Sequence, residues 1–265
     1  MVRWFALVTL VGSASTLAAD YDELSRKADE ALAAGRLAEA QQAYLESVTL
    51  PGRGPWDPNL SRLVLAASEQ GRSASVRAVT GQDARGLLLR ALLDAAGGDL
   101  GAARKSQQQA VALITAADAA SPSLAPALTL LAFLERADGD EAAAKVSDER
   151  AMRLRHKATR EDPLDQALLL ASGAAAKERE KKTAKAAPEA WAKAGAALAA
   201  AGGAGHGLAP AAIEREATLL EKLGRGAAAK AARARAESAV KGVQEKAHTE
   251  ASAGTPCCFS SPGVW

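Results

Sequence analysis

The chain has 265 residues, and its strongest candidates for acid–base catalysis are its three histidines, because imidazole is the commonest general acid or base. They are His156, His206 and His248. No second histidine lies near any of them in the sequence. His156 stands in the basic stretch RLRHKATR, His206 in a glycine-rich stretch, and His248 close to the C-terminal end. We expect all three to be solvent-exposed and non-catalytic, and the sequence therefore predicts no catalytic residue.

Two cysteines, Cys257 and Cys258, are adjacent, and the chain has no other thiol. Disulfides between distant segments therefore do not hold the fold together. We interpret the pair as part of an unstructured tail, with a strained vicinal bridge or a link between two chains as the alternatives. No further ligands stand nearby at the spacing that a metal site requires, so no metal and no cofactor are expected.

The sequence GGAGHG at residues 202–207 superficially resembles a phosphate-binding turn, because glycines let backbone amides face an anion. Such turns follow a strand and open a helix, whereas this one follows an alanine-rich helical pattern. It also lacks the Lys and the Ser or Thr of a P-loop. We therefore predict that it connects two helical hairpins.

The charges of the chain nearly balance, with 33 basic and 31 acidic residues. The basic runs 153–160 and 222–235 have acidic neighbours and no interleaved aromatic residues on which bases could stack. Nucleic acid is therefore not an expected partner. The acidic pair Asp138 and Asp140 flanks a glycine, where capping of the next helix explains it.

These residues must be positioned by helices, and the clearest helical pattern runs from Leu24 to Leu50. Apolar residues recur at spacings of three and four on both sides of Gly35, which predicts two short helices and a tight turn. The pattern consists of Leu24, Ala28, Gly35, Leu37, Ala40 and Tyr44, with Ser47 where Ala is usual. It resembles one tetratricopeptide repeat.

Further hairpins follow, with turns at Gly97-Gly98, at Asp138-Gly139-Asp140 and at Gly224, and a truncated one ends its first helix near Gly71. Gly98 and Gly139 are 139 − 98 = 41 positions apart, and Gly224 lies 224 − 139 = 85 positions further on. This spacing predicts a hidden hairpin with helices at 168–178 and 187–200, a turn near Lys181 or Lys182, and Trp191 in the place of Tyr44. We also expect Leu87, Leu128 and Leu131 to be buried and Arg104, Lys105 and Lys145 to face water.

The fold class that this recurrence and resemblance imply is all-α: a right-handed α-solenoid of antiparallel helix pairs. The period is about eight residues longer than the usual repeat of the family, which leaves a generic helical solenoid as the alternative. The repeat domain is expected at residues 20–241, followed by a disordered tail at 242–265.

Residues 1–19 have the composition of a secretory signal peptide, with Arg3, an apolar run from Trp4 to Val11, and small residues ending at Ala18-Ala19. The run is shorter than the roughly 20 residues that span a bilayer, so we expect cleavage before Asp20 and no integral membrane segment afterwards. The expected location is the periplasm, with full secretion as the alternative.

The resemblance implies a non-catalytic scaffold of the bacterial cell envelope that binds a protein or peptide partner and is not an enzyme. A self-associating structural protein is the alternative, an enzyme with an unrecognised site is the less favoured one, and the oligomeric state is left open. In this family the first helices line a concave wall. The positions that this mapping places on the wall are Arg85, Leu88, Leu92, Thr129, Phe133, Arg136 and Arg179. Phe133 beside Arg136 has the composition of an interaction hot spot, although Phe133 could instead fill a core gap.

Overall fold

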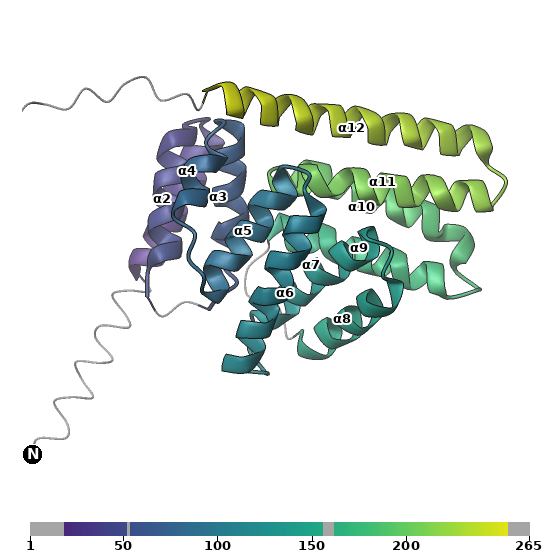
Figure 1. The fold of residues 1–265 in the computed structure, drawn as a ribbon, viewed down its shortest axis with the longest axis horizontal. Coiled ribbons are helices and arrows are strands. Elements are labelled where there is room, and N and C mark those ends of the chain that lie inside the picture. The colour runs from purple at the N-terminus through teal and green to yellow at the C-terminus, as the bar shows by residue number, and fades with distance from the viewer. Residues whose placement is uncertain (1–18, 52–53, 156–161, 254–265) are drawn as a thin grey trace, which may run out of the picture.

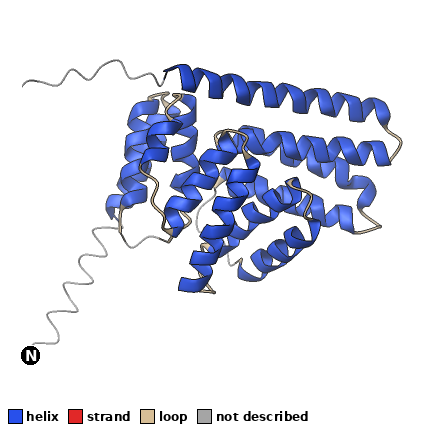
Figure 2. Ribbon diagram, in the orientation of Figure 1, coloured by secondary structure: helices blue, strands red, loops and turns tan. Residues whose placement is uncertain are grey.

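The structure, a computed structural model, describes residues 19–51, 54–155 and 162–253, and every regular element in these ranges is a helix (Figures 1 and 2). The prediction of an all-α chain is confirmed. A first helix covers residues 19–33. The helices that follow are α2 Leu37–Thr49, α3 Pro58–Glu69, α4 Ser73–Ala78, α5 Ala84–Ala96, α6 Leu100–Ala117, α7 Leu124–Ala137, α8 Glu141–Leu154, α9 Pro163–Arg179, α10 Ala187–Ala201, α11 Ala204–Lys222 and α12 Gly226–Ala253.

One turn geometry recurs along the chain and explains why helix pairs form. At Gly139, φ is +84°, the residue after the glycine donates its amide to Glu135, and the glycine donates to Arg136. This pair of bonds is a Schellman motif, which satisfies carbonyls at the helix end and needs a residue of positive φ. The same two bonds recur at Gly35, Gly71, Gly98 and Gly224. Each predicted turn glycine therefore reverses the chain between two helices.

Aspartate side chains start many of the helices. The carboxylate of Asp140 accepts the amide of Ala143 at 3.1 Å at the beginning of α8, and the carboxylate of Asp99 accepts that of Ala102 at 2.9 Å at the beginning of α6. These bonds satisfy amides that have no partner within the helix. The predicted capping role is confirmed for Asp140, whereas Asp138 ends α7 and pairs with Arg104 instead.

The hidden hairpin exists, as α9 and α10 with a short 3-10 turn at Ala184–Ala186 between them. Trp191 of α10 is buried, and its indole Nε1 donates to Glu178 of α9 at 3.3 Å. Tyr44 of α2 is likewise buried, and its hydroxyl donates to Asp29 of the preceding helix at 2.7 Å. The two aromatic residues therefore occupy corresponding places, as the spacing predicts.

The array does not run only from neighbour to neighbour, because α11 packs on α5 and α3 as well as on α10 and α12. The approach to α5 is very close. A Cβ atom added at Gly207 of α11 would lie 1.6 Å from the carbonyl oxygen of Ala95. A Cβ atom at Gly203 would lie 2.9 Å from the amide nitrogen of Leu65 in α3. These contacts bring the C-terminal helices back onto the N-terminal ones.

Two predicted boundaries are corrected by the structure. Helix α12 continues to Ala253, so residues 242–253 are helical rather than part of a disordered tail. The glycine-rich stretch is also shorter than predicted, because residues 204–207 already form the first turn of α11, and His206 lies on that turn. Residues 1–18, which make up nearly all of the predicted signal peptide, lie outside the described residues, as do His156, Cys257 and Cys258.

In the part of the chain that the structure describes, no helix is both long enough and apolar enough to cross a lipid bilayer.

Candidate functional site

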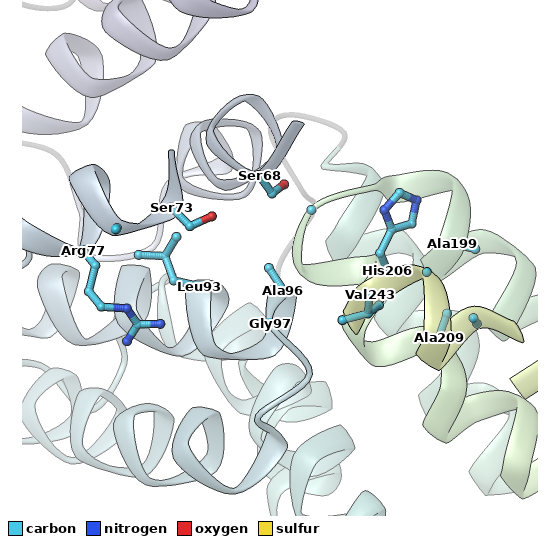
Figure 3. Close-up of a pocket in the computed structure, with 14 residues that line it drawn as sticks. Ser68, Ser73, Arg77, Leu93, Ala96, Gly97, Ala199, His206, Ala209 and Val243 are labelled. Atoms are coloured by element: carbon cyan, nitrogen blue, oxygen red, sulfur yellow. The ribbon is translucent and has the colours of Figure 1, made fainter. Parts of the chain in front are cut away.

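A cleft of about 490 Å³ lies between the N-terminal and C-terminal helices. Its volume falls in the range of about 300–1,000 Å³ that is typical of ligand sites. Helices α3, α4 and α5 form one side, and α10, α11 and α12 form the other (Figure 3). The lining residues are Ser68, Ser73, Ala74, Arg77, Leu93, Ala96, Gly97, Ala199, Gly203, His206, Ala209, Ala239, Gly242 and Val243.

The cleft is hollow because its walls are built from small residues. Alanine and glycine make up most of the lining, and Leu93 and Val243 are its largest aliphatic side chains. The backbone contact between Gly207 and Ala95 fixes how α11 lies beside α5 near the cleft. A side chain at position 207 would push the two helices apart. The small residues therefore set both the contact between the helices and the space beside it.

Few polar groups line the cleft, and the interactions of two of them are defined. Arg77 of α4 pairs through Nη1 with Asp94 at 2.6 Å. The hydroxyl of Ser68 donates to the carbonyl of Leu65 in its own helix at 3.1 Å. His206 is half-buried on α11, on the side of the cleft opposite Arg77 (Figure 3). The charge of Arg77 is thus balanced by Asp94, the Ser68 proton is held by the backbone of its own helix, and the mostly aliphatic walls suit an apolar, uncharged group.

Part of the predicted concave wall lies inside the protein instead. Leu88 and Leu92 of α5 have no exposed surface. The guanidinium of Arg85 donates to the carbonyl of Gly54 at 3.1 Å and also to that of Val48. These bonds tie α5 to the last turn of α2 and to the chain that follows it. The prediction that Leu88 and Leu92 face a partner is wrong, because α11 and α3 pack on α5 and these two side chains are buried. Arg85 is half-buried, and its place on a binding surface stays a prediction.

Thr129, Phe133 and Arg136 of α7 are also buried rather than displayed on an open wall. The hydroxyl of Thr129 donates to the carbonyl of Ala125 at 2.9 Å and accepts Arg155 at 2.9 Å. Phe133 is only 3% exposed, which fits the alternative that it fills the core. The face of α7 that the mapping assigned to a groove is covered by α9.

Arg136 forms an ion pair inside the protein: its Nη2 lies 2.7 Å from Asp148, which is 1% exposed on its side chain. Arg179 at the end of α9 remains at the surface and lies 3.8 Å from the same carboxylate. Asp148 also accepts the hydroxyl of Ser172 at 2.6 Å. The structure thus brings Arg136 and Arg179 together around one aspartate, away from Arg85, Leu88 and Leu92.

Phe133 and Arg136 line a second, smaller cavity of about 190 Å³, together with Trp191 and Arg215. Arg215 of α11 donates to Glu178 at 2.7 Å and also to Glu141. Arg136 pairs with Asp148, and Glu214 pairs with Arg233, so each charged residue that lines this cavity has a partner of opposite charge. We interpret the cluster as a network of ion pairs that holds α7, α8, α9 and α11 together, rather than as a ligand-binding site.

Two carboxyl groups outside both cavities have raised pKa values. Burial raises the pKa of Asp162, at the start of α9, to about 6, and the nearby Asp165 adds to the effect. The amide of Leu164, the hydroxyl of Ser61 and the charge of Arg62 oppose it. Burial also raises the pKa of Glu135 in α7, although the hydroxyl of Ser147 donates to this carboxylate at 2.8 Å and lowers it. Neither group lines the larger cleft.

Sequence reasoning missed the cleft residues. Arg77 lies on α4, which follows the truncated hairpin's first helix, and His206 lies on α11 at a position where the sequence predicts a connection between hairpins. The signal that could have found them is the density of glycine in GGAGHG, since glycine allows another backbone to approach closely. No group of three or more His, Cys, Asp and Glu side chains in the described ranges is arranged to hold a metal ion.

The chain matches no protein-family model, no curated protein and no solved structure. Its function is therefore argued from the geometry of the cleft.

Proposed function

We propose that this protein is a non-catalytic scaffold of the bacterial cell envelope, that its helix pairs form a right-handed superhelix similar to tetratricopeptide repeats, and that it binds a protein or peptide partner. The observation that carries the proposal is the apolar cleft of about 490 Å³ between α4 and α12. Apolar peptide side chains suit such a surface, because they can be buried there without leaving a polar group unpartnered, which would cost free energy.

Two features support a binding role over a catalytic one. The cleft walls are mostly aliphatic, and Arg77, its charged residue, is engaged by Asp94. The hydroxyl of Ser68 points to the backbone of its own helix. A nucleophile needs a base within hydrogen-bond reach, and this hydroxyl is instead committed to a carbonyl.

The location is proposed from residues 1–19, whose Arg3, apolar run and Ala18-Ala19 have the order of a signal peptide. N-terminal sequencing of the protein from its host should begin within a residue or two of Asp20. An intact Met1 on a cytosolic product would contradict export.

A peptide-display selection tests the binding function. Random dodecapeptides are selected on the full mature chain, and the affinity of the best peptide is measured by fluorescence anisotropy. Gly242→Trp, which fills the cleft, should weaken that affinity about tenfold or more, a change of about 1.4 kcal/mol. A Cβ atom at Gly242 meets nothing within 4 Å, so α12 can carry the larger side chain.

Gly173→Trp is the matched control, because Gly173 is an exposed glycine of α9 whose added Cβ atom also meets nothing within 4 Å. It does not line the cleft. The control should leave the affinity unchanged. If no peptide is selected, or if both variants weaken binding equally, the cleft is not a peptide site.

Self-association is a second candidate, and exposed apolar side chains on α8 favour it. Val146 is 64% exposed and Met152 is 61% exposed, and Leu113 of α6 and Leu170 of α9 are also exposed. Such residues are typical of contacts between chains when they gather in one patch. Light scattering over a range of concentrations separates the two functions, since a self-associating protein increases in mass and a monomeric adaptor does not.

A further inference from the structure

The larger cleft restricts the chemistry of what can fill it. Most of its lining residues are alanine, glycine, leucine and valine, and the polar ones are Ser68, Ser73, Arg77 and His206. Arg77 already has its carboxylate partner, Asp94, at 2.6 Å. A charged occupant would lose its hydration without gaining an opposite charge. Large uncharged rings are suited instead, because an aromatic side chain buries about 150–250 Å².

One segment of the chain has this composition. Residues 254–265, GTPCCFSSPGVW, contain no Asp, Glu, Lys or Arg, and they include Phe259 and Trp265. Aromatic residues are only 3% of the whole chain. The segment is therefore unusually rich in rings for this protein and carries no side-chain charge that would oppose its burial.

The segment also begins within reach of the cleft. Val243 of α12 lines the cleft, and α12 ends 253 − 243 = 10 residues later, a distance of about 15 Å along a helix. Phe259 follows Ala253 by 259 − 253 = 6 residues, and these can span about 20 Å when extended. Both rings are thus within reach of the cleft.

The other end of the described chain is less well placed. The helix at residues 19–33 begins at the lower edge of the N-terminal helices in Figure 1, whereas the end of α12 lies above α3 and α4. Residues 1–18 also contain the charged Arg3 and carry the pattern of a cleaved signal. Position and composition therefore both favour residues 254–265.

We propose that residues 254–265 fold back into the cleft between α4 and α12 and occupy it through Phe259 and Trp265 until a partner peptide displaces them. The displacement part rests on the peptide-binding function proposed above. A short tether gives an effective concentration in the mM range. A segment whose intrinsic Kd is about 0.1 mM would thus occupy the cleft in roughly a tenfold excess over the open form.

The two cysteines provide the test, because they are the chain's only thiols and both lie in this segment. In the full mature chain carrying Cys258→Ser, a nitroxide spin label is attached to Cys257, and broadening of backbone amide signals is measured by NMR. The label should broaden the amides of Ala74, Ala96 and His206, which line the cleft from three different helices.

Two kinds of variant check the source of that broadening. Gly242→Trp should abolish it by filling the cleft, and Gly173→Trp should leave it unchanged. Phe259→Ser combined with Trp265→Ser should also abolish it, and these substitutions alter no side chain of the described helices. Thermal melting of each variant shows that the helices remain folded. Absence of broadening in the parent chain, or its persistence in Gly242→Trp, would overturn the proposal.

The selected peptide separates this proposal from the proposed function. Phe259→Ser with Trp265→Ser should raise the affinity for that peptide about tenfold, because the competing segment is removed. If the peptide binds, Gly242→Trp weakens it and the double variant changes nothing, the binding function stands and self-occupancy is wrong. If the label broadens the cleft signals but no peptide is selected, self-occupancy stands and the binding function is wrong.

Discussion

The hairpins α7–α8 and α11–α12 share the same glycine turn, yet they are held in place by different forces. From Ala127 to Arg136 every side chain of α7 is buried. Along residues 226–243 of α12, the buried side chains are those of Ala229, Ala232 and Ala236. Local turn chemistry thus fixes how two helices reverse, whereas the helices that cover them decide how much surface is buried.

The ion pairs of the two hairpins differ in the same way. Arg136 and Asp148 of α7–α8 are 4% and 1% exposed on their side chains. Arg233 of α12 pairs with Glu214 and Glu221 of α11, and all three remain substantially exposed. Water and salt screen the second cluster but hardly reach the first. We therefore expect stability to depend on the buried pair.

Removal of the buried arginine should have the largest effect. Arg136→Ala leaves Asp148 with its charge in the core, and loss of one partner of a buried pair typically costs about 3–5 kcal/mol in the free energy of unfolding. Urea denaturation measures the loss. A loss below about 1 kcal/mol would mean that Arg179, at 3.8 Å, holds the carboxylate in place of Arg136.

Truncation of an aliphatic core residue of α7 should come next. Leu128 is 2% exposed, so Leu128→Ala should cost about 2–5 kcal/mol through lost burial and the cavity left behind. Leu223 at the end of α11 is 41% exposed and serves as the matched control, for which Leu223→Ala should cost under about 0.5 kcal/mol. Equal losses by urea denaturation would remove the contrast between the two hairpins.

A smaller, pH-dependent effect on the free energy of unfolding is expected at Asp162. This residue caps the start of α9, which packs on α7. Its folded pKa of about 6 exceeds the usual 3.8, so the folded state binds the proton more tightly than the unfolded state. The free energy of unfolding should therefore rise as the pH falls from about 6 towards 4. The full difference corresponds to about 3 kcal/mol.

Asp162→Asn tests this, because asparagine keeps the cap on Leu164 but carries no charge. We expect the variant to be more stable by about 1–2 kcal/mol at pH 7.5 and to lose this advantage near pH 4. A weaker slope from Glu135 should remain, since burial raises its pKa too. Thermal melts at several pH values measure both slopes, and an unchanged profile in the variant would contradict the assignment.

The smallest effect is expected at the exposed pairs of α12. Arg233→Ala should leave the melting temperature unchanged within error, because surface ion pairs contribute little. Amide hydrogen exchange should nevertheless be faster along α12 than along α7 in the parent protein, since α12 buries few apolar contacts. Slower exchange in α12 than in α7 would reverse the ranking of the two hairpins.

Much of the local structure could be predicted from the sequence. Glycine at positions 35, 98, 139 and 224 marked the turns, and the spacing between them located α9 and α10, where no glycine marks the turn. Leu87, Leu128 and Leu131 are buried as predicted, and Lys105 and Lys145 are exposed. Turns and the buried face of a helix depend on residues that are close in the sequence, and the periodicity of apolar residues indicates them directly.

The site was less predictable, because it depends on helices that are distant in the sequence. The sequence places the apolar residues Leu88 and Leu92 on α5, but it does not indicate that the distant helix α11 packs on α5. Arg104, expected in water, is partly covered and pairs with Asp138 and Asp140. Periodicity identifies the apolar face of a helix without stating which other helix meets it.

The contact between Gly207 and Ala95 has a consequence for how this protein can change during evolution. A linear helical array can gain or lose a hairpin and keep its remaining interfaces, because each unit meets only its neighbours. Here an insertion or deletion between α5 and α11 would alter the position at which α11 meets the backbone of α5, where there is no room for even one methyl group. The number of hairpins is thereby fixed by the closing contact, and lineages of this fold should vary in their loops and in α12 rather than in repeat number.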